Sequence, residues 1–270
     1  MKPFFLTCFS LCFFTVCAND GQSLGARFAS FGNASVAAND VWSIQHNQAG
    51  IAHLENTAFA LTVENRFGLS ELNLGGAIAA VPTNLGVFGI GFSHVGDEFF
   101  SESNIGVAYA KTFGRSVSAG VQFNYRNTHL GNDYGSKNAL LVEGGLQARL
   151  NTKLTIGAHV FNPNRALLSK DYDERYQNAL RIGFQYIVSD KVMLLGEAEK
   201  QTQQKLIGKF GLEYQLVPTL FLRTGISTNP IQNSFGVGYV LQQFQIDVAI
   251  WKHYQLGYVP QFSITYQLGK

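Results

Sequence analysis

Apolar side chains recur at every second position through most of the chain from Thr57 onward. Residues 116–125 show this clearly, because Val, Ala and aromatic side chains occupy one face and Ser, Gly, Gln and Asn the other. Since successive side chains of a β-strand point to opposite faces, the alternation predicts strands. Its repeats predict about fourteen strands between Thr57 and the C-terminus.

The less apolar face of these strands combines small and charged residues. Gly75, Ala77 and Ala79 on one strand, and Gly106 and Ala108 on another, are assigned to it. The exterior of a soluble sandwich or barrel is rich in Lys, Glu, Thr and Arg instead. We therefore expect the apolar face to contact lipid and the small, charged face to enclose a lumen. The predicted fold is all-β, a transmembrane antiparallel up-and-down β-barrel.

The connections between strands alternate in length. Short ones occur at 83–84, 114–115, 151–152, 189–190, 217–218 and 242–243, and longer ones at 96–103, 128–137 and 162–177. Outer-membrane barrels have short periplasmic turns, longer outer loops and an even number of strands. This pattern predicts a bacterial outer-membrane location with both termini in the periplasm and the barrel over residues 57–270.

Composition narrows the possible classes of protein. Only 14% of residues are charged, 46% are hydrophobic, and the formal net charge is +2. The charge balance excludes a broadly basic nucleic-acid binder. Past the N-terminus no apolar run approaches the roughly 20 residues of a membrane-spanning helix, which excludes a polytopic helical protein.

Residues 1–18 have the pattern of a secretory signal, with Lys2 before an apolar stretch and small residues at 16–18. Cys8, Cys12 and Cys17 all fall within it, so the exported chain contains no thiol. The alternative is a lipoprotein anchored through Cys17.

Residues 19–56 do not alternate and are rich in small residues. Asn39 and Asp40 are suited to cap a short helix before Val41. We predict that this segment enters the barrel lumen as a plug, and the alternative is a mobile periplasmic tail.

This segment resembles the opening of the FadL superfamily, and is most similar to the PorV/PorQ-type barrels of Bacteroidota. The resemblance rests on Gly25, Arg27, Gly32, Asn33, Asp40, Asn47, Ala49 and Gly50. It implies a plug ahead of a barrel of about fourteen strands. The chain departs from the family at Gln48, where Pro is usual, and its outer loops are short.

Patterns that carry enzyme chemistry are sparse. Residues 21–25 match the G-x-S-x-G of hydrolases, but lack the preceding strand and following helix that this motif needs. A lipid-hydrolase pair would combine His129 with Ser101 or Ser103. The six histidines show no dense metal-ligand spacing. The sequence therefore predicts no enzymatic activity, cofactor or metal.

Strand parity predicts charges that face the lumen in equal numbers of each sign. A selective pore would show a ring of one sign, whereas balanced charges indicate cross-lumen pairing around a plug. The alternative is a polar passage for solute. The predicted network comprises Glu64, Arg66, Glu143, Arg149, Arg181, Glu197, Glu199, Lys205, Lys209, Glu213, Arg223 and Asp247.

Two functions remain open. In the first, the chain is a non-enzymatic accessory or scaffold of an outer-membrane secretion or biogenesis assembly. The PorV/PorQ resemblance implies this role and indicates type IX secretion as the system. In the second, it is a FadL-like passive transporter of hydrophobic small molecules, for which the Gly-rich residues 86–91 would permit a break in strand pairing. The expected partners are outer-membrane lipid, other outer-membrane or periplasmic proteins in the first case, and a hydrophobic ligand in the second.

Overall fold

The computed structural model describes residues 24–131, 135–169, 174–202, 204–253 and 256–269. The predicted signal at 1–18, the alternative lipid attachment at Cys17, and Gly21, Gln22 and Ser23 of the hydrolase-like motif lie outside the described residues.

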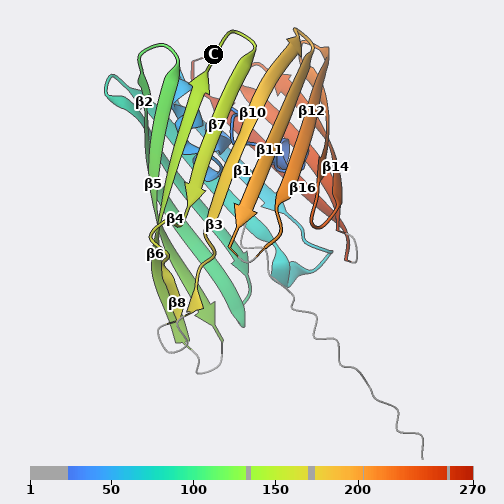
Figure 1. Cartoon of the computed structure of the whole chain (residues 1–270). Helices are drawn as coiled ribbons and strands as arrows, with labels where there is room; N and C mark the ends of the chain where they lie inside the picture. Colours follow the sequence, from blue (N-terminus) through green and yellow to red (C-terminus); the bar gives the residue numbers. More distant parts are fainter. Residues whose placement is uncertain (1–23, 132–134, 170–173, 203, 254–255, 270) are drawn as a thin grey trace, which may run out of the picture.

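Fourteen strands form one closed antiparallel barrel, which confirms the predicted fold class (Figure 1). The ring closes where β1 pairs with β16, from Ala58 opposite Gln267 to Glu64 opposite Gln261. The barrel strands are β1 (Ala58–Glu64), β2 (Leu74–Thr83), β3 (Gly86–Gly96), β4 (Phe100–Phe113), β5 (Val117–Leu130), β6 (Gly135–Arg149), β7 (Leu154–Phe161), β10 (Ala179–Ser189), β11 (Val192–Gln201), β12 (Ile207–Val217), β13 (Leu220–Ser227), β14 (Gln232–Leu241), β15 (Phe244–His253) and β16 (Gly257–Gln267).

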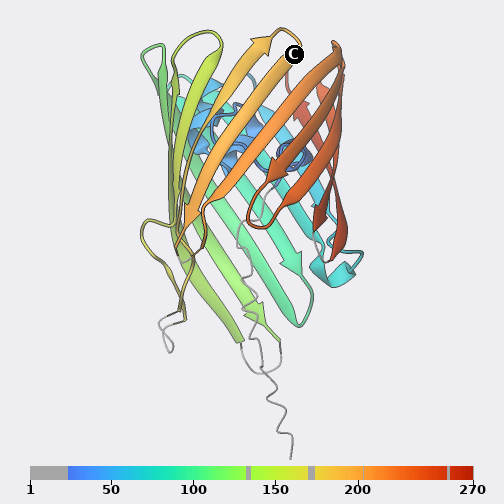
Figure 2. The same cartoon turned by 45° about the vertical axis from the view of Figure 1, so that its right-hand side comes forward.

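The two ends of the barrel differ. Tight turns join the strands at the end where β16 finishes, which we call the turn end, and longer connections lie at the opposite, loop end (Figures 1 and 2). Strands β4, β5 and β6 are the longest, with 14, 14 and 15 residues. The connection after β7 contains a small hairpin of β8 (Leu167–Ser169) and β9 (Glu174–Arg175), which the sequence pattern did not predict because its strands are so short.

The outward face of the wall is apolar, as the inverted pattern predicts. On β5, Val121 and Phe123 are 46% and 54% exposed, whereas the alternating Gln122 and Asn124 are buried inside. The parity assigned to β2 was wrong. Leu74, Ile78 and Ala80 point inward there, because Leu24 and other apolar residues of the inner segment pack against them, so Gly75, Ala77 and Ala79 face outward.

Strand β3 pairs without interruption on both sides. Its residues from Gly86 to Val95 pair with β2, and those from Val87 to Gly96 pair with β4. The Gly-rich sequence suggested a break in pairing, but Gly86, Gly89 and Gly91 are all in register with β2, so this strand has no such break.

Short helices complete the described residues. They are α1 (Ala26–Ala29), the 3₁₀ helices η1 (Val41–Gln45) and η2 (Gln48–His53), and η3 (Ser70–Leu72) in the β1–β2 loop. None of the helices in the described ranges has the length and apolar character needed to cross a membrane.

Candidate functional site

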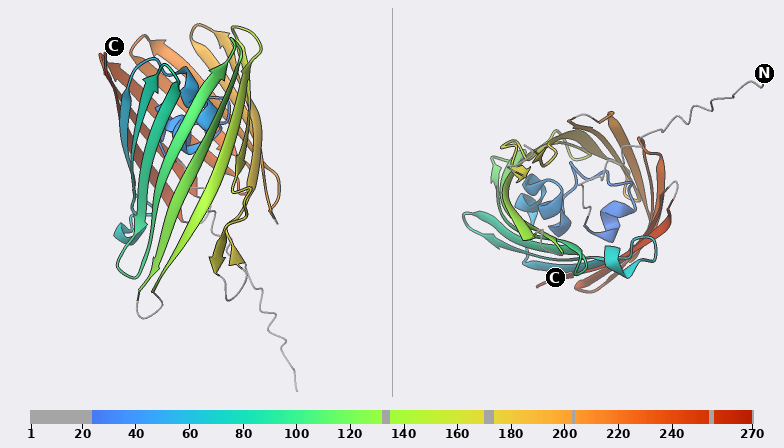
Figure 3. Two further views of the ribbon diagram at one scale, coloured as in Figure 1. Left: turned by 90° about the vertical axis from the view of Figure 1, so that its left-hand side faces the viewer. Right: turned by 90° about the horizontal axis from the view of Figure 1, so that it is seen from below.

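Residues 24–57 precede β1, and we call them the inner segment. The view along the barrel axis shows α1, η1 and η2 within the ring of strands (Figure 3). The side views show the inner segment in the half nearer the turn end (Figures 1 and 2). That this segment acts as a plug stays a prediction.

Glycines of the wall make room for the inner segment. A Cβ atom at Gly225 would lie 2.0 Å from the carbonyl carbon of Phe31, and one at Gly157 would lie 2.2 Å from the carbonyl oxygen of Val36. A Cβ at Gly120 would lie 2.6 Å from the backbone of Gln48. Since real Cβ atoms do not approach this closely, the small inward residues allow backbone to pack against backbone.

The first part of the inner segment is bound to β14 and β16 by serine hydroxyls. The backbone N–H of Ala26 donates to Ser263 Oγ at 3.2 Å. Ser234 Oγ accepts from the N–H of Gly32 at 2.9 Å and donates to the carbonyl of Ser30 at 3.0 Å. These bonds satisfy polar groups at both ends of α1, which is too short to satisfy them itself.

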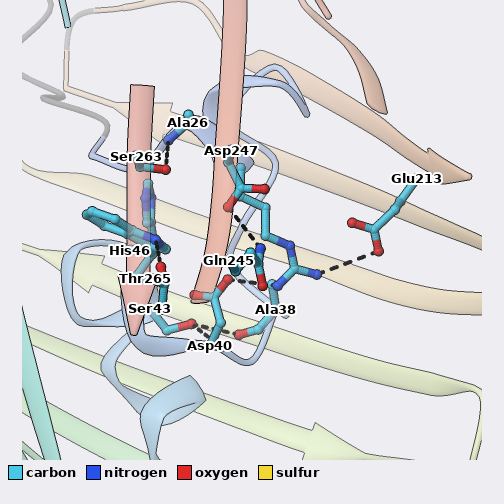
Figure 4. A network of polar contacts seen from close by, with 12 residues as sticks. Ala26, Ala38, Asp40, Ser43, His46, Glu213, Gln245, Asp247, Ser263 and Thr265 are labelled. Carbon is cyan, nitrogen blue, oxygen red and sulfur yellow. Dashed lines mark hydrogen bonds and ion pairs between the residues drawn. The ribbon is translucent and has the colours of Figure 1, made fainter. Parts of the chain in front are cut away.

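Arg27 and Asp40, two residues of the FadL-like motif, pair with each other across the inner segment. Arg27 Nη1 lies 2.8 Å from Asp40 Oδ2, and Nη2 lies 3.7 Å from Glu213 Oε1 on β12 (Figure 4). The motif therefore closes the segment on itself and attaches it to the wall.

A second arginine continues this network within the wall. Arg223 of β13 donates from Nε to Glu213 at 2.6 Å and from Nη1 to Asp247 of β15. Gln245 donates to the second Asp247 oxygen at 2.8 Å. Charge-assisted hydrogen bonds thus link β12, β13 and β15, although β14 lies between the last two in the wall.

The ion pair at Arg27 shifts the protonation equilibria of both partners. Burial alone would lower the pKa of Arg27, but the carboxylates of Glu213 and Asp40 outweigh it and raise the pKa above its ordinary value. Burial raises the pKa of Asp40, and the neighbouring Arg27 only partly offsets that effect. Arg27 is therefore a fixed positive charge, whereas Asp40 is the group of the pair that protonates first.

Glu197 of β11 accepts hydrogen bonds from two backbone N–H groups of the inner segment. Its Oε2 lies 2.9 Å from the nitrogen of Ser35 and 2.9 Å from that of Val36. Its Oε1 lies 2.7 Å from Lys209 Nζ of β12, which also pairs with Glu199 at 2.5 Å. Arg181 of β10 lies 3.2 Å from Glu199. Two carboxylates and two cationic side chains therefore form one charge-balanced cluster at the point where the segment turns.

The second part of the inner segment contacts β3 to β6. Asn47 precedes η2, and its Oδ1 accepts from the N–H of Ala49 at 3.2 Å, while its Nδ2 donates to Leu146 O of the wall at 3.2 Å. Gln48 Nε2 donates to Glu143 at 3.0 Å. Glu143 also contacts His159 at 3.0 Å and Asn124 at 2.7 Å. The departure from Pro at position 48 therefore provides a hydrogen-bond donor to a buried carboxylate.

His46 lies between the two parts of the inner segment. Its Nε2 is 2.9 Å from the carbonyl oxygen of Leu24, and its ring contacts that of Phe28 edge-on at 4.7 Å. Burial lowers the pKa of His46 to about 4. The imidazole is therefore neutral at physiological pH, and its Nε2–H donates a hydrogen bond to the Leu24 carbonyl.

The remaining motif residues shape the path of the chain. Gly25 and Gly32 have φ of 100° and 64°, and Asn33 follows at 64°, in the left-handed region that glycine and asparagine tolerate. A Cβ at Gly50 would lie 2.5 Å from the carbonyl oxygen of Ala38, which accounts for that glycine. Ala49 is buried beside it.

Most of the predicted lumen charges meet in pairs, but two do not join the network. Glu64 and Arg66 pair at 2.5 Å near the loop end. Lys205 is exposed in the connection between β11 and β12, and Arg149 is exposed at the turn end of β6. The alternation of faces predicts an inward side chain only within a strand. Arg149 is the last residue of β6, and Lys205 lies outside the strands, so the prediction does not apply to them.

Arg126 of β5 also faces the lumen, although it was not among the predicted charges. Its guanidinium is 3.5 Å from Glu102 and lies over the rings of Phe161 and Tyr176. Arg126 has the same parity as Gln122 and Asn124, so extending the alternation by one step identifies it as inward.

Two small polar cavities lie in the lumen beside the inner segment. Their volumes are about 50 and 60 Å³, and both are lined by Gln45 and Arg181. Arg126 contributes to the first, and Asn229 and Pro230 of the β13–β14 loop contribute to the second. These cavities are therefore on the loop side of η1.

An apolar stripe interrupts the polar lumen on one side. Leu74 and Val95 are directly paired on β2 and β3, and both are buried with Ile78. They belong to the same apolar cluster as Leu24 and Ile44 of the inner segment. The lumen thus offers both polar and apolar contacts to a small molecule.

The serine and histidine residues considered for lipid hydrolysis lie at exposed positions near the loop end. Pairing of β4 with β5 sets Ser101 opposite His129, but His129 Nδ1 contacts Ser136 at 2.9 Å, and Ser103 contacts His94 at 2.9 Å. Among the described residues, no group of three or more His, Cys, Asp or Glu side chains is arranged to hold a metal ion.

Several solved structures are similar to this chain in fold. No family model and no curated protein matches this chain. The Pseudomonas putida toluene transporter TodX is 10% identical, with a TM-score of 0.69 over 91% of this chain and 98% of its own. The Ralstonia pickettii toluene transporter TbuX is 11% identical, with a TM-score of 0.67 over 92% and 98%.

A Pseudomonas aeruginosa FadL homologue is 13% identical, with a TM-score of 0.62 over 90% of this chain and 98% of its own. At such low identity the likeness concerns the fold alone. The chain therefore has the fold of the FadL-type outer-membrane barrels.

Proposed function

We propose that this chain is an outer-membrane channel of FadL type that conducts a small hydrophobic molecule, with the inner segment as its gate and both termini in the periplasm. The observation that carries the proposal is the buried apolar stripe of Leu74, Ile78 and Val95, which continues into the inner segment at Leu24 and Ile44. A hydrophobic molecule entering from the loop end would bind along this stripe. It would pass when the inner segment moves.

Three further features support the proposal. The outward wall is apolar, with Leu61 58% and Phe123 54% exposed, as lipid contact requires. The fold is shared with two proteins described as toluene transporters. The inner segment is held by hydrogen bonds, ion pairs and apolar packing rather than by strand pairing with the wall, so its displacement leaves the barrel ladder intact.

Uptake of toluene tests the ligand class. Cells that express the barrel should take up labelled toluene faster than cells with an empty vector. Leu74→Asn should lower the initial rate severalfold, because a buried amide disrupts the apolar stripe. Leu85→Asn, at an exposed turn position, is the matched control and should leave uptake unchanged. Equal uptake with barrel and empty vector would refute the proposal.

Conductance across a planar bilayer tests the gate. Gly225→Val should open a path for ions, because its side chain would overlap the backbone of Phe31 and displace the inner segment. Gly75→Val is the control, since no heavy atom lies within 4 Å of a Cβ there. A wild-type protein that already conducts steadily, or a Gly225→Val barrel that stays closed, would contradict the assignment of the inner segment as a gate.

The second candidate is the accessory or scaffold role in a secretion or biogenesis assembly. It is favoured by the buried ion pairs that hold the inner segment, such as Lys209 with Glu197 and Arg27 with Asp40. Purification from native membranes in mild detergent discriminates the two. A stoichiometric complex with other envelope proteins would support the scaffold, and a barrel that purifies alone would support the channel.

A further inference from the structure

A groove of about 730 Å³ is hollowed in the outward face of the wall across β6, β7, β10, β11 and β12. Its floor is formed by small outward residues, including Ala158, Ala198 and Gly208, and its sides by larger ones, including Ile156 and Phe210. A Cβ at Gly208 would have its nearest neighbours at 3.6 and 3.8 Å, so the floor has free space above it. The groove is as large as a ligand pocket of ~300–1,000 Å³.

Exposed cations lie at the turn end of the strands that carry this groove. Arg115, Lys153 and Lys191 are exposed on the three successive turns β4–β5, β6–β7 and β10–β11. Backbone hydrogen bonds tie these turns to the adjacent strands, from Arg149 N to Ser116 O at 2.7 Å and from Ile187 N to Lys153 O at 2.8 Å. We call Arg115, Lys153 and Lys191 the basic arc.

The basic arc is confined to one side of the barrel. The tight turns of the other side, at 83–86, 217–220 and 241–244, carry no charged residue. On the turns of the basic arc the exposed acid is Asp190, next to Lys191. The groove begins at Val117 and Ile156, close in sequence to Arg115 and Lys153, so charge and groove form one continuous surface.

We propose that this surface binds one anionic phospholipid, with its phosphate at the basic arc and an acyl chain in the groove. The inference rests on the proposed membrane location. Each Lys or Arg near the membrane surface attracts anionic lipid. A loop or extended peptide is a poorer occupant, because its backbone groups would be unsatisfied at hydrocarbon depth, whereas an acyl chain has none.

Native mass spectrometry of the full barrel in neutral detergent, with added phosphatidylglycerol or phosphatidylethanolamine, tests this proposal. The wild type should retain one phosphatidylglycerol in preference to phosphatidylethanolamine. The triple variant R115Q/K153Q/K191Q should lose on the order of tenfold to a hundredfold in affinity for phosphatidylglycerol. The triple variant K200Q/K205Q/K252Q removes three exposed lysines at the loop end and should bind as the wild type does.

The groove is tested separately by Gly208→Leu, which fills the space above the floor without a backbone clash. It should weaken phosphatidylglycerol binding severalfold while the barrel keeps its heat-modifiable migration on gels. Unchanged binding in either the arc variant or Gly208→Leu would overturn the proposal, as would equal retention of both lipids. A barrel that needs no detergent would refute the membrane location itself, which distinguishes the two failures.

Discussion

The two parts of the inner segment are attached to the wall by different physical means. The part around α1 contacts β11 to β16 through ion pairs and serine hydroxyls, with Glu197 and Arg27 at the centre. The part around η1 and η2 contacts β1 to β6 through apolar packing, in which Ile44 approaches Gly89, and through uncharged amide donors such as Gln48. Charge pairing fixes geometry but includes a desolvation penalty, whereas apolar packing depends on filled volume. The two attachments should therefore respond to different perturbations.

Lys209→Met should produce the largest loss. It leaves Glu197 and Glu199 buried with fewer positive partners, and breaking a buried pair by removing one member costs about 3–5 kcal/mol. The free energy of unfolding, measured by urea titration in detergent, should fall by that amount. Lys200, on the neighbouring strand β11, is exposed, and Lys200→Met should change the free energy of unfolding by less than about 0.5 kcal/mol. An equal effect of both variants would mean that the ion pairs do not hold the α1 part.

Ile44→Ala probes the apolar attachment. Ile44 is fully buried, and its removal should cost about 2–5 kcal/mol through lost transfer free energy and a cavity beside β3. Combined with Lys209→Met, the two losses should add within about 0.5 kcal/mol if the two parts are attached independently. The double variant measured by the same urea titration decides this, and a large coupling energy would show that the inner segment behaves as one unit.

Acid should weaken the junction between the two parts through His46. The folded pKa of about 4 lies below the ordinary value of 6.5, so the unfolded chain takes up the proton first as the pH falls. The contribution of neutral His46 to the free energy of unfolding is complete above pH 6.5. It declines toward pH 4, by roughly 3 kcal/mol in total.

Asp40 has the opposite sign, because its raised pKa favours the folded state at low pH. The difference between the wild type and His46→Gln therefore isolates the histidine. The pH dependence of the urea midpoint should be flatter in His46→Gln between pH 6.5 and 4. Parallel curves for the two proteins would contradict a neutral, buried His46.

Alternation of side chains was enough to predict the barrel, because a strand whose two faces differ has one favourable orientation in lipid. It failed on β2, where Leu74 and Ile78 point inward although the neighbouring Gly75 and Ala77 are smaller. There the inner segment supplies apolar partners, and a strand pattern alone contains no information about what packs inside.

The residues that contact the motif residues could not be predicted from the sequence either. Arg27 and Asp40 stood out as motif residues, but their pairing depends on the turn of the chain between them and on Glu213, far away in sequence. In the sequence Gln48 is only a departure from Pro, and nothing there indicates that Glu143 lies opposite it. Such cross-lumen contacts depend on strand register, which alternation does not fix.

The junction of the inner segment with the wall limits how far it can travel. η2 ends at His53 and β1 begins at Ala58, so a tether of four residues joins them. Four residues reach at most roughly 14 Å when fully extended. The end near η2 is therefore confined to short excursions, while α1 lies at the far end of the segment, and any motion that clears the lumen should be a swing about residues 54–57 rather than an ejection.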